Sequence, residues 1–211
     1  MKTTFEELTK RKIIPVIVID DAADAVPLAE ALLEGGVDVI EITFRTAAAA
    51  DAISAIAKSV PQMLLGAGTV VTADQATRAL NSGITFGLAP GVNPVTVERF
   101  QKADTLFVPG IMTSSEIELG LALGCKLLKF FPAVQAGGPD FIKALSGPYA
   151  PLGIKFCPTG GITLDTMNDY LSLPIVSSIG GSWLATAKQI AAKEWKTITA
   201  QAKESLARVG K

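Results

Sequence analysis

Histidine is missing from this sequence of 211 residues, and cysteine occurs only twice. Without an imidazole there is no Ser-His-Asp or Cys-His nucleophile pair and no histidine zinc site, so catalysis would rest on carboxylates, lysines, hydroxyls or the backbone. Cys125 and Cys157 lack CxxC or Cys/His ligand spacing. Reduced core thiols are therefore expected, with no metal, and Cys157 is expected to face the helices as a small hydrophobic side chain.

A surplus of one charge and long apolar runs are absent as well. Nineteen Lys and Arg stand against twenty Asp and Glu, which leaves no basic excess for nucleic-acid binding. The most apolar stretches, 13–19 and 119–131, are too short or too interrupted to span a bilayer. The amino terminus has no signal-peptide pattern. We therefore expect a soluble, cytoplasmic protein with neither nucleic-acid nor membrane partners.

The sequence does contain ample apolar material, since 49% of its residues are hydrophobic, and 1–211 is predicted to form one domain. Short β-branched runs alternate with Ala- and Leu-rich amphipathic segments. Strands are predicted at 13–19, 37–44, 63–68, 84–89, 105–110, 126–131, 154–160 and 175–181. Helices are predicted at 3–11, 22–34, 47–59, 73–82, 94–102, 113–123, 139–146, 163–171 and 184–209.

Local signals support these boundaries. Gly36, Gly83 and Gly124 each separate a predicted helix from the next strand, where a left-handed cap favours glycine. Thr113 and Glu116 have the spacing of a capping box. Eight strands with crossover helices, and no G-x-G-x-x-G after the first strand, favour a (β/α)₈ TIM barrel with an additional N-terminal helix.

The active site of such a barrel lies at the carboxyl ends of its strands, and polar residues occur there. Period-two alternation places Glu41 and Arg45 on the same face of the second strand, pointing inward. In the sixth strand, Lys129 shares a face with Leu127 and Phe131. Burial disfavours an ammonium, so Lys129 could hold a free amine that attacks ketones. Spacing alone favours the alternative, in which Lys129 snorkels from a strand end or pairs with Glu41 in a structural ion pair.

The last two strands end in the glycine pairs of PTGGI (158–162) and IGGSW (179–183). Backbone N–H groups of the loops after strands seven and eight often cradle a phosphate in barrels, although glycine pairs also serve as simple tight turns. Thr69, in GAGT (66–69), could reach a substrate oxygen. The sequence thus combines a lysine, an acid, an arginine and two possible phosphate loops.

At these residues the sequence resembles the bifunctional 2-keto-3-deoxy-6-phosphogluconate aldolase / 2-keto-4-hydroxyglutarate aldolase family of class I aldolases. The resemblance covers nearly the whole chain. Its motifs are VIEITFRT (39–46), GAGTV (66–70), PG (90–91), PGI (109–111), LKFFPA (128–133), GP (147–148), FCPTGGI (156–162) and IGGSWL (179–184).

The resemblance implies roles for these residues. Lys129 would form the Schiff base, and Glu41 would relay protons. Arg45 and Thr69 would contact the pyruvate-derived carboxylate, Phe131 would pack against the substrate, and Thr159 would hydrogen-bond to it. The phosphate would be ringed by Gly160, Gly161, Gly181 and Ser182. The family also implies a homotrimer and no cofactor.

The implied substrates are phosphorylated 2-keto-3-deoxy sugar acids, cleaved to pyruvate and glyceraldehyde 3-phosphate, and 4-hydroxy-2-oxoglutarate, cleaved to pyruvate and glyoxylate. One departure is visible: Val134 stands where family members often carry glutamate. Two alternatives stay open. One is an aldolase for the galactonate epimer or another 2-keto-3-deoxy acid, and the other is a phosphosugar-binding barrel without aldol chemistry.

Overall fold

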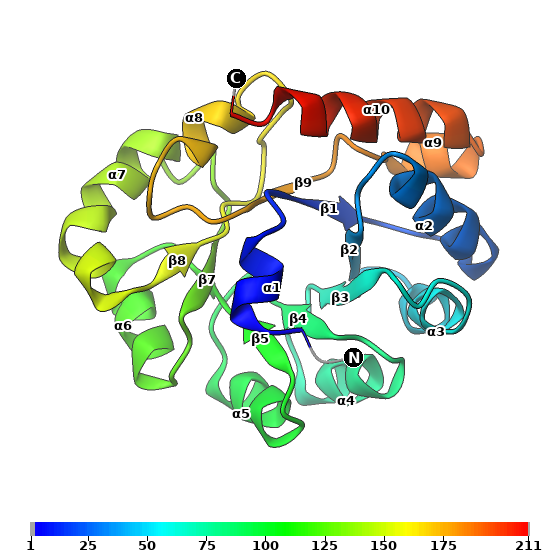
Figure 1. Ribbon diagram of the computed structural model, residues 1–211. Helices are drawn as coiled ribbons and strands as arrows, with labels where there is room; N and C mark the ends of the chain where they lie inside the picture. Colours follow the sequence, from blue (N-terminus) through cyan, green and yellow to red (C-terminus); the bar gives the residue numbers. More distant parts are fainter. Residues whose placement is uncertain (1–2, 211) are drawn as a thin grey trace.

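The computed structural model describes residues 3–210 and has an α/β fold, with strands in the middle of the molecule and helices around them (Figure 1). All strand pairs described by the register are parallel. The strands are β1 (Ile13–Ile17), β2 (Val39–Thr43), β3 (Leu64–Gly68), β4 (Phe86–Leu88), β5 (Leu106–Val108), β6 (Gly110–Ile111), β7 (Leu127–Phe130), β8 (Lys155–Phe156) and β9 (Ile179–Gly181).

Backbone hydrogen bonds divide these strands between two sheets. One has the order β5-β4-β3-β2-β1-β9, and the other has the order β6-β7-β8. Isolated parallel bridges, Phe156 to Val176 and Thr159 to Gly180, lie between the end of β8 and the segment of β9. The predicted strand 105–110 is split because Pro109, between β5 and β6, has no N–H for a ladder hydrogen bond. The hydrogen-bonded sheets are thus six and three strands wide rather than one sheet of eight.

The helices follow the predicted alternation. They are α1 (Phe5–Thr9), α2 (Ala25–Glu34), α3 (Ala49–Ser59), α4 (Ala73–Asn81), α5 (Pro94–Lys102), α6 (Ser114–Ala122), α7 (Gly138–Tyr149), α8 (Met167–Leu171), α9 (Ala187–Ala191) and α10 (Trp195–Arg208), with short 3-10 turns at Ala22–Asp24 and Ala150–Leu152. The helix predicted at 184–209 is interrupted, because Lys193 takes a left-handed conformation with φ 54° between α9 and α10.

The expected helix boundaries have the expected chemistry. Gly36, Gly83 and Gly124 have φ values of 87°, 95° and 77°, which confirms the left-handed caps. Thr113 and Glu116 form a capping box at the start of α6. A second box, between Thr72 and Gln75, begins α4. These local signals mark where the helices concerned begin or end, before the chain enters the next strand.

The core is apolar, with large side chains such as Phe86, Phe100, Phe130 and Phe156 fully buried. Strands β1, β2 and β3 are buried at every position, as expected where helices cover one face of a parallel sheet and other strands face the opposite side. Two ionisable side chains of opposite charge, Glu41 and Lys129, are buried in this core. Such burial is costly and directs attention to their surroundings.

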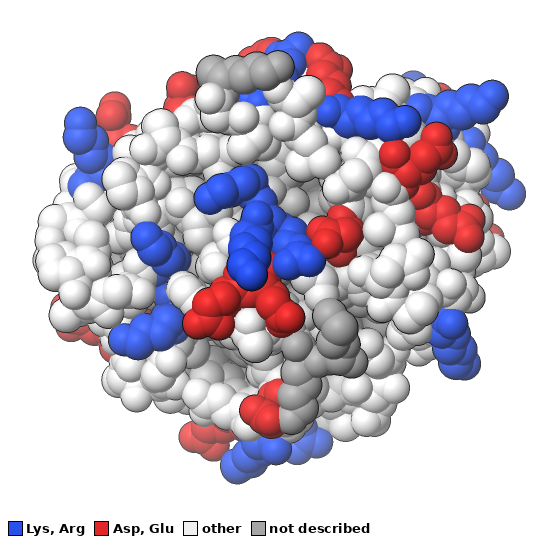
Figure 2. Space-filling model, in the orientation of Figure 1, with Lys and Arg blue, Asp and Glu red and all other residues white. Residues whose placement is uncertain are grey.

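The face shown in Figure 2 carries Lys and Arg interspersed with Asp and Glu, and a group of basic side chains lies near its centre, over α1. A hollow here is lined by Lys10, Arg11, Lys12 and Asp38 among others. No helix within residues 3–210 combines the length and apolar character that a membrane span needs.

Candidate active site

Glu41 and Lys129 meet in the interior although they are 88 residues apart in the chain. Glu41 lies on β2 and Lys129 on β7, and the Lys129 Nζ donates a hydrogen bond to Glu41 Oε1 at 3.0 Å. Only 5% of the lysine side chain and 1% of the glutamate side chain are exposed. The predicted encounter of the two side chains is confirmed, and it takes place in a dry environment.

One carboxylate oxygen of Glu41 has no hydrogen-bond partner in the part of the chain that the structure describes. Glu41 Oε2 is buried and accepts no hydrogen bond within residues 3–210. A purely structural buried ion pair is stabilised by satisfying its remaining lone pairs, because an unsatisfied buried acceptor costs free energy. The free oxygen beside an amine is instead suited to a hydroxyl or water that enters with a ligand.

Gly68, at the end of β3, makes room for this carboxylate. It pairs with Thr43 across the sheet, two residues beyond Glu41. A Cβ at Gly68 would overlap Glu41 Oε1, and the Glu41 Cδ and Cγ atoms would lie only 2.6 Å from it. The backbone of β3 therefore fixes where the Glu41 side chain can lie. The GAGT motif was interpreted through Thr69, and the role of Gly68 was not predicted.

Cys157 also belongs to this interior, which corrects the expectation that it faces the helices. Burial raises the pKa of its thiol to about 11, against the opposing effects of a hydrogen bond with Ser178 and the charge of Lys129. Alternation explains the error: Cys157 is two residues before Thr159 and so shares its face. A neutral thiol thus lies beside the Lys129–Glu41 pair.

A pocket of about 430 Å³ lies beside the pair. Phe131 connects the two, because its ring lines the pocket and its centroid is 5.8 Å from the Lys129 Nζ. The pocket is lined by Val16, Val18, Arg45, Phe131, Pro132, Gln135, Thr159, Gly160, Gly161, Ile162, Gly180 and Ser182. Arg45 is the charged side chain in this lining, so the pocket has a positive character.

Most of the predicted binding residues reach this pocket. Arg45 is exposed, and its Nε is 3.4 Å from Thr69 Oγ1, which brings Thr69 to the same rim. Thr159 is buried, and its Oγ1 lies 3.4 Å from the Cys157 carbonyl oxygen. The same Oγ1 atom also faces Gly180, where a Cβ would overlap the threonine side chain. A short β8 and the bridge to β9 therefore hold Thr159 in the wall.

The two glycine loops differ in how they reach the pocket. Gly160 and Gly161 line it with φ values of 107° and 79°, a backbone conformation that favours glycine. Ser182 lines it as well. Gly181 is not among the lining residues: it is buried, and its backbone packs against the Trp183 ring, which leaves no space for a Cβ. Gly180 takes its place in the wall.

Gln135 and Val134 follow the lysine strand at the rim. Gln135 lines the pocket and was missed because no motif distinguished it. Val134 is 44% exposed, and a Cβ at Gly161 would lie 2.9 Å from its Cβ and Cγ2 atoms. The position where family members often carry glutamate is therefore an apolar contact with the glycine loop in this chain.

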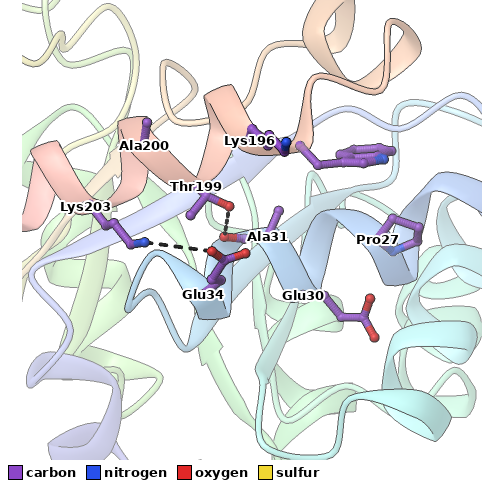
Figure 3. A pocket seen from close by; sticks show the side chains of 9 residues that line it. Pro27, Glu30, Ala31, Glu34, Lys196, Thr199, Ala200 and Lys203 are labelled. Carbon is purple, nitrogen blue, oxygen red and sulfur yellow. Dashed lines mark hydrogen bonds and ion pairs between the residues drawn. The ribbon is translucent and has the colours of Figure 1, made fainter.

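A different groove lies between α2 and α10 and measures about 490 Å³ (Figure 3). Its polar contacts hold the two helices together: Thr199 Oγ1 donates to the Ala31 carbonyl oxygen at 2.9 Å, and Lys203 lies 3.8 Å from Glu34. None of the predicted site residues lines it. Chemistry is therefore better sought at the somewhat smaller pocket beside Lys129.

Known proteins resemble the chain over its full length. "2-dehydro-3-deoxy-phosphogluconate aldolase" of Treponema pallidum is 42% identical over 210 residues, which cover 100% of this chain and 99% of that protein. "KHG/KDPG aldolase" of Escherichia coli K12 is 42% identical, with 97% of this chain and 96% of that protein covered.

Solved structures agree. A KDPG aldolase from Legionella pneumophila, with pyruvate captured as a covalent carbinolamine intermediate, has a TM-score of 0.91 and 39% identity, and covers 95% of this chain and 97% of its own. The 2-keto-3-deoxy-6-phosphogluconate aldolase of Zymomonas mobilis ZM4 with 3-phosphoglycerate has a TM-score of 0.87 and 37% identity, with 95% and 93% covered. The family model for KDPG and KHG aldolase matches residues 5–201, and the chain belongs to that family.

Proposed function

We propose that this chain is a class I aldolase that cleaves 2-keto-3-deoxy-6-phosphogluconate to pyruvate and glyceraldehyde 3-phosphate, and 4-hydroxy-2-oxoglutarate to pyruvate and glyoxylate. The observation that carries the proposal is the buried Lys129 amine, 3.0 Å from a buried carboxylate whose second oxygen is free. An amine and an acid beside a pocket suit carbonyl chemistry without a metal.

The first stage is imine formation. A proton can pass from Lys129 Nζ to Glu41 Oε1 across their hydrogen bond, which leaves a neutral amine and a carboxylic acid. The amine attacks the C2 ketone of the substrate and forms a carbinolamine. Glu41 then protonates the departing hydroxyl, water leaves, and the nitrogen is bonded to C2 as an iminium.

The second stage breaks the carbon–carbon bond. Glu41, again a carboxylate, accepts the proton of the C4 hydroxyl directly or through a water. The C3–C4 electron pair moves toward the iminium nitrogen, which gives an enamine and releases the aldehyde. Protonation of the enamine at C3 and hydrolysis of the imine consume one water, free pyruvate and restore Lys129.

Binding roles follow from the pocket. Arg45, with Thr69 beside it, holds the carboxylate next to the carbonyl. Phe131 packs on the substrate, and Thr159 donates a hydrogen bond to it. Gly160, Gly161 and Ser182, which line the pocket, surround the phosphate with backbone N–H groups as donors. Gly181 belongs to the same loop and supports Ser182 from the buried side. The pyruvate and 3-phosphoglycerate found with the two relatives support an assignment of both ends of this pocket.

The architecture that we propose is a single (β/α)₈ barrel domain over 1–211, with α1 as its additional N-terminal helix. In it, β5 and β6 count as one strand broken at Pro109, and the bridges of Phe156 and Thr159 join β8 to the segment of β9. We further propose a homotrimer, by similarity to the family.

Reductive trapping tests the reaction. Borohydride added with pyruvate should leave a covalent adduct on the peptide that contains Lys129, as measured by mass spectrometry, and Lys129→Ala should lose both the adduct and turnover. Lys126→Ala is the matched control, because this exposed lysine lies on the same segment, donates a hydrogen bond to the Leu152 carbonyl oxygen at 3.3 Å, and is not among the residues that line the pocket. An adduct that persists in Lys129→Ala would overturn the proposal.

A further inference from the structure

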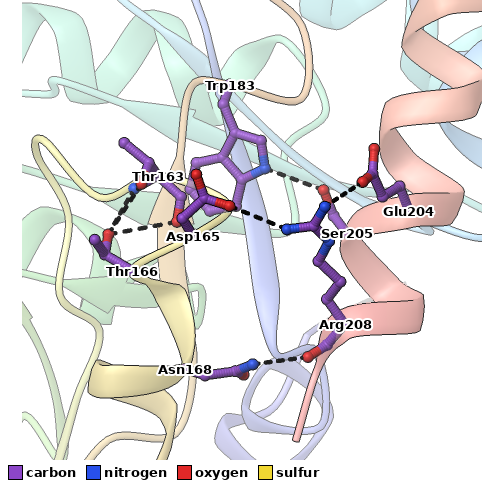
Figure 4. A network of polar contacts seen from close by, with 8 residues as sticks. All are labelled: Thr163, Asp165, Thr166, Asn168, Trp183, Glu204, Ser205 and Arg208. Atoms are coloured by element: carbon purple, nitrogen blue, oxygen red, sulfur yellow. Dashed lines mark hydrogen bonds and ion pairs between the residues drawn. The ribbon is translucent and has the colours of Figure 1, made fainter. Parts of the chain in front are cut away.

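The C-terminal helix α10 is fastened to both glycine loops of the pocket, although none of its residues lines that pocket. Figure 4 shows the contacts: side chains from the loops after β8 and β9, and Asn168 of α8, point toward α10. The loop after β9 is held by Trp183, and the segment after β8 is held by Asp165 of the loop and Asn168 of α8.

The attachment of the β9 loop ends on a buried residue of α10. Trp183 Nε1 donates a hydrogen bond to Ser205 Oγ at 3.0 Å, and Ser205 is fully buried on the inner face of α10. The opposite end of the indole packs against Gly181, so closely that a Cβ there would overlap the ring. Ser182, which lines the pocket, lies between Gly181 and Trp183 in sequence. The position of Ser182 is therefore fixed by the Trp183 indole, which contacts Ser205 at one end and Gly181 at the other.

The attachment of the β8 loop is more exposed. Arg208 Nη1 lies 3.0 Å from Asp165 Oδ1, and Asn168 Nδ2 donates to the Arg208 carbonyl oxygen at 2.8 Å. Thr163 and Thr166 are joined by hydrogen bonds that shape the turn after Gly161. One helix therefore holds the segment that follows Gly160 and Gly161 as well as the segment that contains Ser182.

We infer that Ser205 is a positioning residue for the phosphate end of the substrate, acting through Trp183 on Gly181 and Ser182. This inference rests on the proposed function, since it takes these loops as the phosphate site. Backbone donors bind an anion well only when their geometry is fixed beforehand, because ordering them during binding costs conformational entropy. Loss of the Trp183–Ser205 hydrogen bond should therefore weaken the binding of a substrate that carries a phosphate and leave the binding of a substrate without one unchanged.

Ser205→Ala tests the inference with two substrates. We expect KM for 2-keto-3-deoxy-6-phosphogluconate to rise about five-fold with kcat nearly unchanged, as expected when one hydrogen bond that orders a binding loop is lost. Both constants for 4-hydroxy-2-oxoglutarate should stay within about two-fold, because that substrate ends at C5 and has no phosphate. Steady-state kinetics on both substrates measures the difference.

The matched control is Ser82→Ala, which removes a buried serine hydrogen bond of 2.7 Å to the Ala79 carbonyl oxygen at the end of α4, a helix separated from α10 by α2 and α3 (Figure 1). Ser82→Ala should change KM and kcat by the same factor, or not at all, for the two substrates. If Ser205→Ala does not fold, Trp183→Phe removes the same donor and keeps a ring against Gly181. Equal changes for the two substrates, or no change, would overturn the inference. Failure of the proposed function is distinguishable, because pyruvate trapping at Lys129 would then fail in the unmodified protein.

Discussion

Two ion pairs at different places in the molecule show what turns a charge pair into a reactive one. Arg11 and Asp38 lie beside the hollow near α1 and approach to 2.7 Å, closer than Lys129 and Glu41 at 3.0 Å. Their side chains, however, are 25% and 43% exposed, against 5% and 1% for the interior pair. Water therefore screens the closer pair and not the more distant one.

The surface pair also differs from the interior pair in its capacity to exchange protons and to accept further hydrogen bonds. The hydrogen bond to Asp38 raises the pKa of Arg11, whose guanidinium keeps its proton in proteins in any case. Both Asp38 oxygens are used, by the Arg11 Nε and Nη2 atoms at 3.1 and 2.7 Å. Glu41 keeps one oxygen free. The pair near α1 is thus complete in itself, whereas the interior pair has capacity left for a substrate.

Of the variants that test the difference between the two ion pairs, Glu41→Gln is expected to have the largest effect on turnover. We expect kcat to fall by about 10²–10⁴-fold, because the amide can neither accept nor return a proton. Trapping of pyruvate on Lys129 should become slower without disappearing, since the amine remains but the group that takes its proton and protonates the departing hydroxyl is lost. The measurements are steady-state turnover and borohydride labelling of the same preparation. Turnover close to that of the original protein would remove Glu41 from the mechanism.

The next effect in size is expected from Gly68→Ala. The added methyl group would overlap Glu41 Oε1 and displace the carboxylate from Lys129. A displacement on the order of 1 Å at a reacting group costs about 10²-fold in rate, which turnover assays would detect. Gly147→Ala is the matched control, because a Cβ at that position of α7 would meet no atom of residues 3–210 within 4 Å apart from its chain neighbours and the nearby backbone of its own helix. A rate loss as large in the control would contradict this account.

A smaller effect concerns stability at high pH and reports how dry the interior is. The pKa of Cys157 is raised from 9.0 to about 11 by burial, so between these values the unfolded chain has lost a proton that the folded chain keeps. Stability should therefore fall as pH rises from 9 to 11 and level off above, by roughly 2–3 kcal/mol for this thiol. Urea unfolding across this range measures it. Burial raises the pKa of the Cys125 thiol to about 11 as well, so Cys157→Ser and Cys125→Ser should each remove part of the loss of stability and the double variant should remove more than either. A profile that Cys157→Ser leaves unchanged would contradict this account.

The smallest effect is expected at the exposed pair. Asp38→Asn should change the free energy of unfolding by no more than about 1 kcal/mol, and added salt should reduce even that difference. Turnover should stay the same, since neither member of the pair lines the pocket beside Lys129. Urea unfolding at low and high salt provides the measurement. A large loss of activity would show that the two regions are not independent.

Periodicity and local signals predicted much of this structure. Alternation along two strands was enough to place Glu41 and Lys129 on facing surfaces, because strand geometry leaves little choice once a core is assumed. Glycines 36, 83 and 124 marked helix ends because a positive φ needs a residue without a Cβ. These features depend on a few neighbouring residues and so can be read locally.

Other features depend on contacts between distant segments. The interruption of the last helix at Lys193 has no local sequence signal. The left-handed conformation of Lys193 separates α9 from α10, and α10 then packs against α2. Gln135 reaches the pocket only because the chain turns after β7. The requirement for glycine at position 68 becomes visible only when the Glu41 side chain is known to lie against it. Tertiary packing decides each of these.

The overlap between position 68 and the carboxylate also bears on how this sequence can diverge. A side chain on β3 at that position is tolerated only if residue 41 becomes shorter or turns away, so the two sites should change together or not at all. Natural variants that carry alanine at 68 beside an intact glutamate at 41 should consequently be rare, and a compensating pair of changes is the route by which selection could pass between the two arrangements.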